Sequence, residues 1–156
     1  MNNILMVDLK NQYLKIKDQI DKTIINTIES SQFIGGPEVE NFKASLEQYL
    51  GVKHVIPCAN CTDALQISLM SLNLERGDEI IVPAFTYIAA VEVIALLGLK
   101  PILVDVNLDN FNILVEDIEN KITSRTKAII PIHLFGQGSN MEELLKISQK
   151  YNFVFV

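Results

Sequence analysis

Apolar residues recur along this chain with a helical period near the N-terminus. Isoleucine occupies every fourth position from Ile16 to Ile28, which forms one stripe along a helix. A second helix is expected to begin at Pro37, where proline removes no helical hydrogen bond, and to end at Gly51. Its predicted buried face consists of Val39, Phe42, Leu46, Tyr49 and Leu50.

Further along, short runs rich in isoleucine and valine alternate with amphipathic segments. We expect strands at 55–56, 79–82, 101–106, 127–132 and 153–156, with a polar loop at 107–112. Helices are expected over 62–74, 89–97, 115–122 and 140–150, and the last of these begins with a capping box of Asn140 and Glu143. Buried strands separated by helices are typical of a mainly parallel sheet covered on both faces. The predicted fold class is therefore α/β, with a mainly parallel sheet sandwiched by helices.

Composition narrows the possible functions. The 156 residues carry a formal net charge of -6 and show no basic stripe, which argues against a nucleic-acid surface. No apolar run is long enough to span a bilayer, and the N-terminus lacks the pattern of a secretory signal. Two cysteines do not make a disulfide framework, and we assign no metal ligands. We expect a cytoplasmic protein without nucleic-acid or membrane partners.

The segment from Cys58 to Leu65 carries the most specific chemistry. We interpret it as a strand exit and a polar turn, followed by a helix that begins at Thr62. A helix N-terminus presents unpaired N–H groups and a positive dipole end, so it can hold a phosphate, and the Thr62 hydroxyl adds a donor. Two alternatives stay open. One is an ordinary helix cap, and the other is redox chemistry of Cys58 and Cys61, which form a C-x-x-C motif.

A second segment places an aromatic ring beside this turn. Tyr87 follows the buried strand at 79–82, and the C-terminal ends of parallel strands share the edge where ligands bind. A phosphate cradle and an aromatic face on one edge suit a ligand with a flat ring and a phosphate arm. Pyridoxal 5′-phosphate is such a ligand.

Several motifs, in order, resemble one enzyme family. Residues 60–65, Asn-Cys-Thr-Asp-Ala-Leu, resemble the Ser-Gly-Thr-Asp-Ala-Leu element of the nucleotide-sugar aminotransferases of the DegT/DnrJ/EryC1/StrS family. The resemblance continues through 76–87, 103–106 and 122–137, and it runs from about Val7 to the last residue. Within the family, segments 7–13 and 32–39 look most like enzymes that aminate C3 of UDP-linked 3-keto-hexuronates.

The resemblance implies a domain organisation. Residues 1–36 would form an N-terminal helix and a substrate-facing segment, and 37–156 the first part of the large domain of a fold type I transferase that uses pyridoxal phosphate. In the family, the carboxylate that holds the pyridine nitrogen and the Schiff-base lysine both follow the strand that begins here at Phe153. We therefore interpret the chain as an N-terminal part of a catalytic domain, without catalytic residues of its own, that should not transaminate alone.

The resemblance also assigns roles to individual residues. Thr62 would bind the cofactor phosphate together with the backbone at Cys61 and Asp63, and Tyr87 would stack on the pyridine ring. Cys61 departs from the family, which usually has glycine there, and this puts the tightness of phosphate binding in question. The substrate-facing candidates are Ser31, Phe33 and His133. For His133, a neutral ring held by backbone groups is the alternative.

The activity implied for the complete protein is transfer of an amine from glutamate, by way of the cofactor, to a nucleotide-linked keto-sugar. The expected substrate is a UDP-2-acetamido-3-keto-hexuronate or a related 3-keto sugar, used in making cell-surface polysaccharide such as lipopolysaccharide O-antigen. A homodimer is implied as well. The alternatives are a sugar dehydratase or non-catalytic relative on the same fold, and a dithiol oxidoreductase using the C-x-x-C motif.

Overall fold

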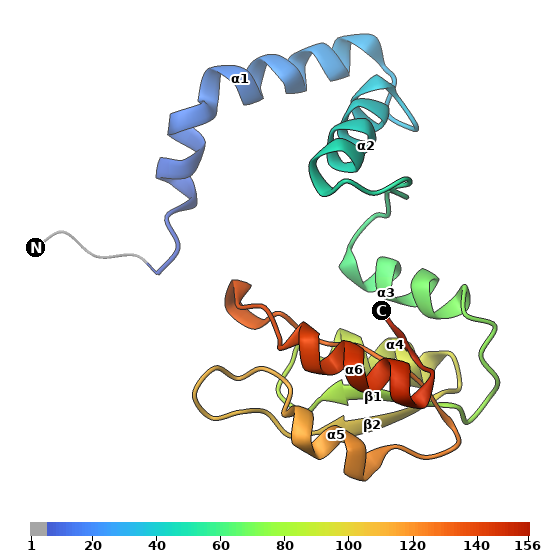
Figure 1. Ribbon diagram of the computed structural model, residues 1–156. Helices are drawn as coiled ribbons and strands as arrows, with labels where there is room; N and C mark the ends of the chain where they lie inside the picture. Colours follow the sequence, from blue (N-terminus) through green and yellow to red (C-terminus); the bar gives the residue numbers. More distant parts are fainter. Residues whose placement is uncertain (1–5) are drawn as a thin grey trace, which may run out of the picture. The chain divides into compact units, whose positions relative to one another are not determined.

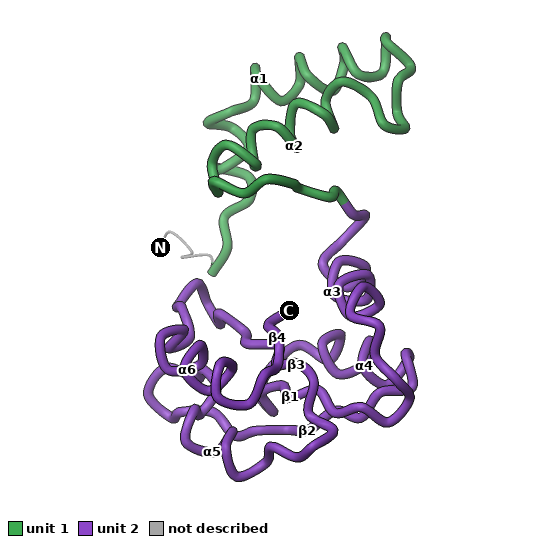
Figure 2. Tube along the Cα trace, turned by 45° about the vertical axis from the view of Figure 1, so that its right-hand side comes forward, with its two compact units in different colours: residues 1–57 green, residues 58–156 purple. Residues whose placement is uncertain are grey.

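The computed structural model describes residues 6–156. The chain divides into two compact units, Met1–Pro57 and Cys58–Val156 (Figure 2). The first unit contains helices α1 (Leu9–Ser30) and α2 (Pro37–Leu50), and the second contains a sheet with its flanking helices (Figure 1).

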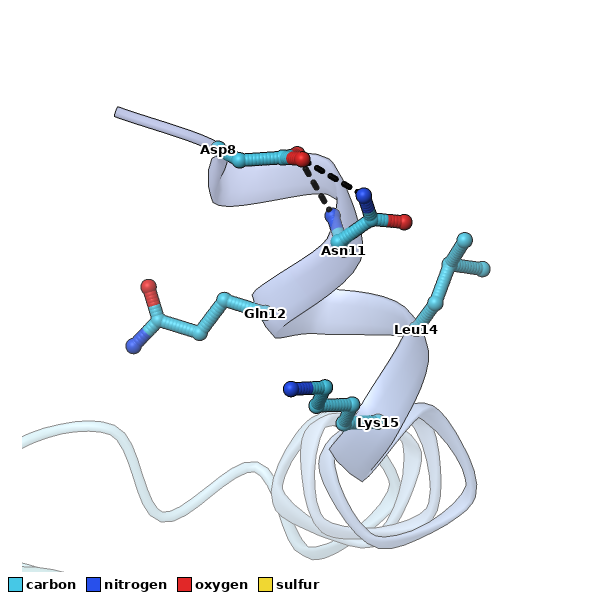
Figure 3. A pocket seen from close by; sticks show the side chains of 5 residues that line it. All are labelled: Asp8, Asn11, Gln12, Leu14 and Lys15. Carbon is cyan, nitrogen blue, oxygen red and sulfur yellow. Dashed lines mark hydrogen bonds between the residues drawn. The ribbon is translucent and has the colours of Figure 1, made fainter. Parts of the chain in front are cut away.

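Both helices of the first unit form where the apolar period predicts them. The Asp8 carboxylate caps α1 by accepting a hydrogen bond from the Asn11 backbone N–H at 3.0 Å. Figure 3 shows the Asp8 carboxylate accepting hydrogen bonds from the backbone and side chain of Asn11, and both residues line a pocket on the first turns of α1. Pro37 is the first residue of α2, and Gly51 ends it with φ 65°, a left-handed conformation that glycine adopts without strain.

The predicted buried face of α2 is wrong for this chain. None of the residues of α1 or α2 is buried, although both helices are described in full. The side chains of Phe42 and Tyr49, for example, are 58% and 84% exposed. Periodicity therefore located both helices correctly, but the predicted face of α2 is only half-buried at Val39 and Leu46 and is exposed at its other positions.

The strand predicted at 55–56 is also wrong. Residues 52–58 contain neither helix nor strand, and Ile56 is 76% exposed.

The second unit is built on a four-stranded sheet of order β2-β1-β3-β4, in which every pairing is parallel. The strands are β1 (Glu79–Pro83), β2 (Lys100–Val104), β3 (Thr126–Ile129) and β4 (Val154–Phe155). All five residues of the central strand β1 are buried. This arrangement confirms the predicted parallel sheet. Strands β2, β3 and β4 end earlier than predicted, whereas β1 extends one residue further.

Helices cover both faces of the sheet, as predicted. On one face α3 (Cys61–Met70) and α4 (Ala89–Leu96) pack with Ile80 and Val82. On the other face α5 (Val115–Lys121) and α6 (Met141–Tyr151) pack with Ile81. The Asn140 side chain accepts a hydrogen bond from the Glu143 N–H at 3.3 Å, so this half of the predicted capping box is present. A short 3-10 turn, η1 (Leu134–Gly136), follows β3.

A buried carboxylate lies at the start of β1. The Glu79 side chain is only 6% exposed, and it accepts hydrogen bonds from Lys100 Nζ at 2.9 Å and Thr123 Oγ1 at 2.6 Å. The bonds from Thr123 and Lys100 hold the pKa of Glu79 below its ordinary value, against the opposing effect of burial. These contacts join β1, β2 and the turn before β3 at the N-terminal edge of the sheet.

Candidate functional site

The candidate site is the edge at which the parallel strands end. After β1 the chain turns to α4 on one face, and after β3, the neighbour of β1, it turns to α6 on the opposite face. Connections that leave two adjacent strands in opposite directions open a crevice between the strand ends, where ligands of α/β proteins bind. Tyr87 follows the end of β1 and His133 follows the end of β3, so these two candidates flank the switch point.

Helix α3 begins at the same edge. Its last turn leads through residues 71–78 into β1, and its Leu69 packs on that strand's side chains, so α3 runs back against the strand direction (Figure 1). One turn after Thr62, Leu65 packs against the cluster that contains Ala90 of α4. The first turns of α3 and α4 are thus part of one packed layer, and both point toward the ends of the strands.

Asn60 is the N-cap of α3. Its side-chain oxygen accepts a hydrogen bond from the Asp63 N–H at 2.9 Å, and its side-chain nitrogen donates to the Asp63 carboxylate at 3.1 Å. In the described part of the chain, the backbone N–H groups of Cys61 and Thr62 and the Thr62 hydroxyl donate to no other group. The first turn therefore leaves two amides and one hydroxyl for an anion, while the third amide, that of Asp63, is already engaged.

Cysteine at position 61 does not strain the turn. Cys61 is the first residue of α3, and it is not among the described residues with a positive φ angle. The backbone freedom of glycine is thus not needed here. Both Cys58 and Cys61 are exposed, and no disulfide joins them within the described chain.

Removing the cap should test its contribution to the fold. We expect Asn60→Ala to lower the free energy of unfolding by about 1 kcal/mol, because the Asp63 N–H loses its acceptor. Chemical denaturation of the full-length protein measures this change. Asn60→Ser keeps a capping oxygen and is the matched control. A loss as large for serine as for alanine would contradict the role of the cap.

The loop that carries Tyr87 is held by a neighbouring aromatic pair. The rings of Phe85 and Phe111 lie 5.5 Å apart between centroids, at an interplanar angle of 40°. Phe111 belongs to the loop after β2, so this contact links the segments that follow two adjacent strands. The Tyr87 ring itself is 79% exposed, which leaves it available for stacking on a ligand.

His133 is oriented by a backbone contact. Its Nδ1 accepts a hydrogen bond from the Ser139 N–H at 3.1 Å, and the buried Ser139 hydroxyl donates to the Ile132 carbonyl at 3.1 Å. An accepting Nδ1 carries no proton, so a neutral ring has its proton on Nε2. This geometry matches the neutral, backbone-held ring considered as the alternative, and it leaves the Nε2–H as a donor on an exposed side chain.

The remaining candidates, Ser31 and Phe33, belong to the first unit. Ser31 ends α1 in a left-handed conformation, and its hydroxyl donates to the Ile28 carbonyl at 3.4 Å. Phe33 is 64% exposed. The structure thus places five candidates at one edge of the second unit: Cys61, Thr62, Asp63, Tyr87 and His133. Ser31 and Phe33 belong to the first unit.

Two negative findings concern the described residues alone. Residues 6–156 contain no group of three or more His, Cys, Asp and Glu side chains able to hold a metal ion. Within the same range, no helix has the length and apolar character needed to cross a membrane.

Comparison with known proteins decides the family. A model of the DegT/DnrJ/EryC1/StrS aminotransferase family matches residues 14–156. The chain belongs to this family. It is 46% identical to UDP-2-acetamido-2-deoxy-3-oxo-D-glucuronate aminotransferase of Pseudomonas aeruginosa, over 95% of this chain and 41% of that protein. The chain thus spans about two-fifths of the length of such a relative.

Solved structures of DegT/DnrJ/EryC1/StrS aminotransferases share the fold. An enzyme of the family from Brucella abortus superposes with a TM-score of 0.93 at 38% identity, over 98% of this chain and 43% of that one. NtdA from Bacillus subtilis, solved with bound cofactor PMP, gives 0.86 at 35% identity, over 90% of this chain and 32% of that one. These similarities confirm the predicted fold type. The all-parallel sheet also argues against a thioredoxin-like oxidoreductase, which would require antiparallel strands.

Proposed function

We propose that this chain forms part of an aminotransferase that uses pyridoxal phosphate to aminate a nucleotide-linked keto-sugar. The observation that carries the proposal is the first turn of α3, with its open amides and hydroxyl, at the strand edge that also presents Tyr87. Relatives at 46% and 39% identity, from Pseudomonas aeruginosa and Aneurinibacillus thermoaerophilus, are named as an aminotransferase and a transaminase of nucleotide-linked sugars, and the first name specifies a 3-oxo sugar.

The residues of this edge fit the cofactor. The N–H groups of Cys61 and Thr62 and the Thr62 hydroxyl would hold the phosphate at the positive end of the α3 dipole. The Asp63 N–H can contribute only by sharing or leaving its bond to Asn60. Tyr87 would cover the ring. When bound, the cofactor supplies an electron sink for amine transfer, and the residues of this chain position it.

The finer assignments rest on family resemblance. We propose that the substrate is a UDP-2-acetamido-3-keto-hexuronate or a related 3-keto sugar, that glutamate donates the amine, and that His133 contributes its Nε2–H to the substrate together with Ser31 and Phe33. We also propose residues 1–36 as the substrate-facing segment and 37–156 as the first part of the large domain. A cytoplasmic homodimer that serves polysaccharide or O-antigen synthesis completes the proposal.

Product formation tests the activity. The full-length protein, loaded with pyridoxal phosphate and mixed with glutamate and a UDP-3-keto sugar, should release 2-oxoglutarate and an amino sugar. A panel of UDP-, dTDP- and GDP-linked keto-sugars shows which nucleotide the substrate must carry. Loss of the sugar hydroxyl without amine transfer would point to a dehydratase, and no reaction with any keto-sugar would contradict the proposal.

Removal of the Tyr87 ring should loosen the cofactor. We expect Tyr87→Ala to weaken pyridoxal phosphate binding by about 0.5–1.5 kcal/mol beyond the loss of buried area, because ring stacking disappears. Titration of the cofactor absorbance measures the affinity. Tyr87→Phe keeps the ring and should bind nearly as well as the unmodified protein. Equal weakening in both variants would show that the hydroxyl, not the ring, makes the contact.

A further inference from the structure

The two thiols beside the phosphate turn are not used by the proposed function. Cys61 is the first residue of α3. Cys58 is the first residue of the second unit, and two residues separate it from Cys61. Both are exposed, and they are not joined to each other by a disulfide. Accessible cysteines in a C-x-x-C motif at the start of a helix are typical of reversible redox pairs.

We infer that Cys58 and Cys61 form a reversible disulfide that weakens the binding of the cofactor phosphate by α3. The inference rests on the proposed function, because its effect is on the cofactor that this helix is proposed to hold. The pair would be a thiol modification site, and its oxidant would be a small disulfide such as oxidised glutathione.

The reaction is two successive thiol–disulfide exchanges. One cysteine thiolate attacks a sulfur of oxidised glutathione, forms a mixed disulfide and releases one glutathione thiolate. The second cysteine thiolate then attacks the protein sulfur of that mixed disulfide and releases the other glutathione. The two protein thiols are oxidised, one oxidised glutathione becomes two reduced glutathiones, and the two thiol protons end on the released glutathiones. Excess reduced glutathione reverses both steps.

The bond would act on the backbone that shapes the cradle. A disulfide requires Cα atoms within about 7 Å of each other, and here it closes a ring across Ala59 and Asn60. Asn60 has an extended backbone, with φ -162° and ψ 174°, and it caps α3 through Asp63. The ring fixes the Cys61 side chain toward Cys58 and restrains the residues that aim the first amides of the helix. Losing one hydrogen bond to a charged phosphate corresponds to about 10- to 100-fold weaker binding.

The test compares the reduced and oxidised full-length protein. After equilibration with defined ratios of reduced to oxidised glutathione, intact mass and peptide mapping identify a bond between Cys58 and Cys61, and absorbance titration measures pyridoxal phosphate affinity. We expect the bond to form and the affinity to fall about 10-fold or more. Cys58→Ser is the control, because it cannot close the ring. Intact mass identifies any Cys61 that carries glutathione, and the protein without it should keep the affinity of the reduced protein at ratios that oxidise the unmodified one.

Each outcome separates this inference from the proposed function. A mapped disulfide with unchanged cofactor affinity overturns the inference alone, and so does the absence of the disulfide at every glutathione ratio while the reduced protein binds the cofactor. A reduced protein that does not bind pyridoxal phosphate overturns both the proposed function and the inference. If oxidation weakens cofactor binding in the unmodified protein but not in Cys58→Ser, the result supports both the proposed function and the inference.

Discussion

Replacing Thr62 with alanine is expected to weaken pyridoxal phosphate binding about 10- to 100-fold, because a hydrogen bond to a charged group is lost. The Thr62 hydroxyl has no partner among the described residues, so its removal leaves no protein group unsatisfied. The side chain is only partly buried in the first turn of α3, and the stability of the fold should change little. Absorbance titration of the full-length protein with the cofactor measures the effect.

A matched variant separates the hydroxyl from the backbone. Thr62→Ser keeps the oxygen and should retain most of the affinity, whereas Thr62→Val keeps the shape and should behave like alanine. If valine binds the cofactor as tightly as threonine, the phosphate is held by backbone amides alone, and the side-chain role proposed for Thr62 is wrong.

Replacing Glu79 with alanine is expected to lower the free energy of unfolding by about 2–3 kcal/mol, because two hydrogen bonds to a buried charge disappear. These are the bonds from Lys100 Nζ and Thr123 Oγ1. Denaturant unfolding of the full-length protein measures the change. Glu79 lies at the start of β1, away from the strand edge that carries Tyr87, so cofactor affinity should stay the same.

The pH dependence of stability should report the same carboxylate. The folded pKa of Glu79 is lowered, so the unfolded chain binds its proton more readily. The contribution of Glu79 is therefore complete above the unfolded pKa of about 4.3 and is lost as the pH falls through the lower folded value. The Glu79→Ala variant should lack this component of the acid transition.

An exposed ion pair provides the control for Glu79. Glu142 accepts a hydrogen bond from Lys146 at 2.8 Å, but the two side chains are 82% and 67% exposed. Water screens such a pair, so Glu142→Ala should change stability little. A loss in Glu142→Ala as large as that in Glu79→Ala would contradict the view that burial gives Glu79 its effect.

The sequence predicted the structure best where a local apolar pattern could be combined with a simple rule of sheet topology. The run Glu79-Ile80-Ile81-Val82 predicted a buried strand because it is short, apolar and β-branched, and the structure confirms it. The argument for Thr62 relied on a strand at 55–56, and residues 52–58 contain none; Thr62 lies at the edge because α3 runs back against β1. Tyr87 could be assigned to this edge because parallel strands end together. The parallel order of the strands confirms the premise of that argument.

Other features depend on contacts between distant residues, which periodicity does not encode. The helix containing Phe42 was predicted correctly, but its predicted buried face is only half-buried at Val39 and Leu46 and is exposed at its other positions. Val55 and Ile56 have the composition of a strand, but residues 52–58 contain neither helix nor strand. The bond from the Ser139 N–H to His133 requires the loop after β3 to fold back on itself, and the residue types alone do not predict it. The capping role of Asn60 was closer to prediction, because asparagine before a helix is a recognised start signal.

The position of β1 in the sheet has a consequence for synthesis of the chain. Both of its neighbours, β2 and β3, come later in the sequence, and Glu79 pairs with Lys100 on one side and Thr126 on the other. During translation the apolar strand β1 emerges before either partner exists, and distant parallel pairings form slowly. We therefore expect nascent chains that end between Pro83 and Ile129 to bind chaperones that recognise exposed apolar segments. Chains that extend past β3 should release these chaperones.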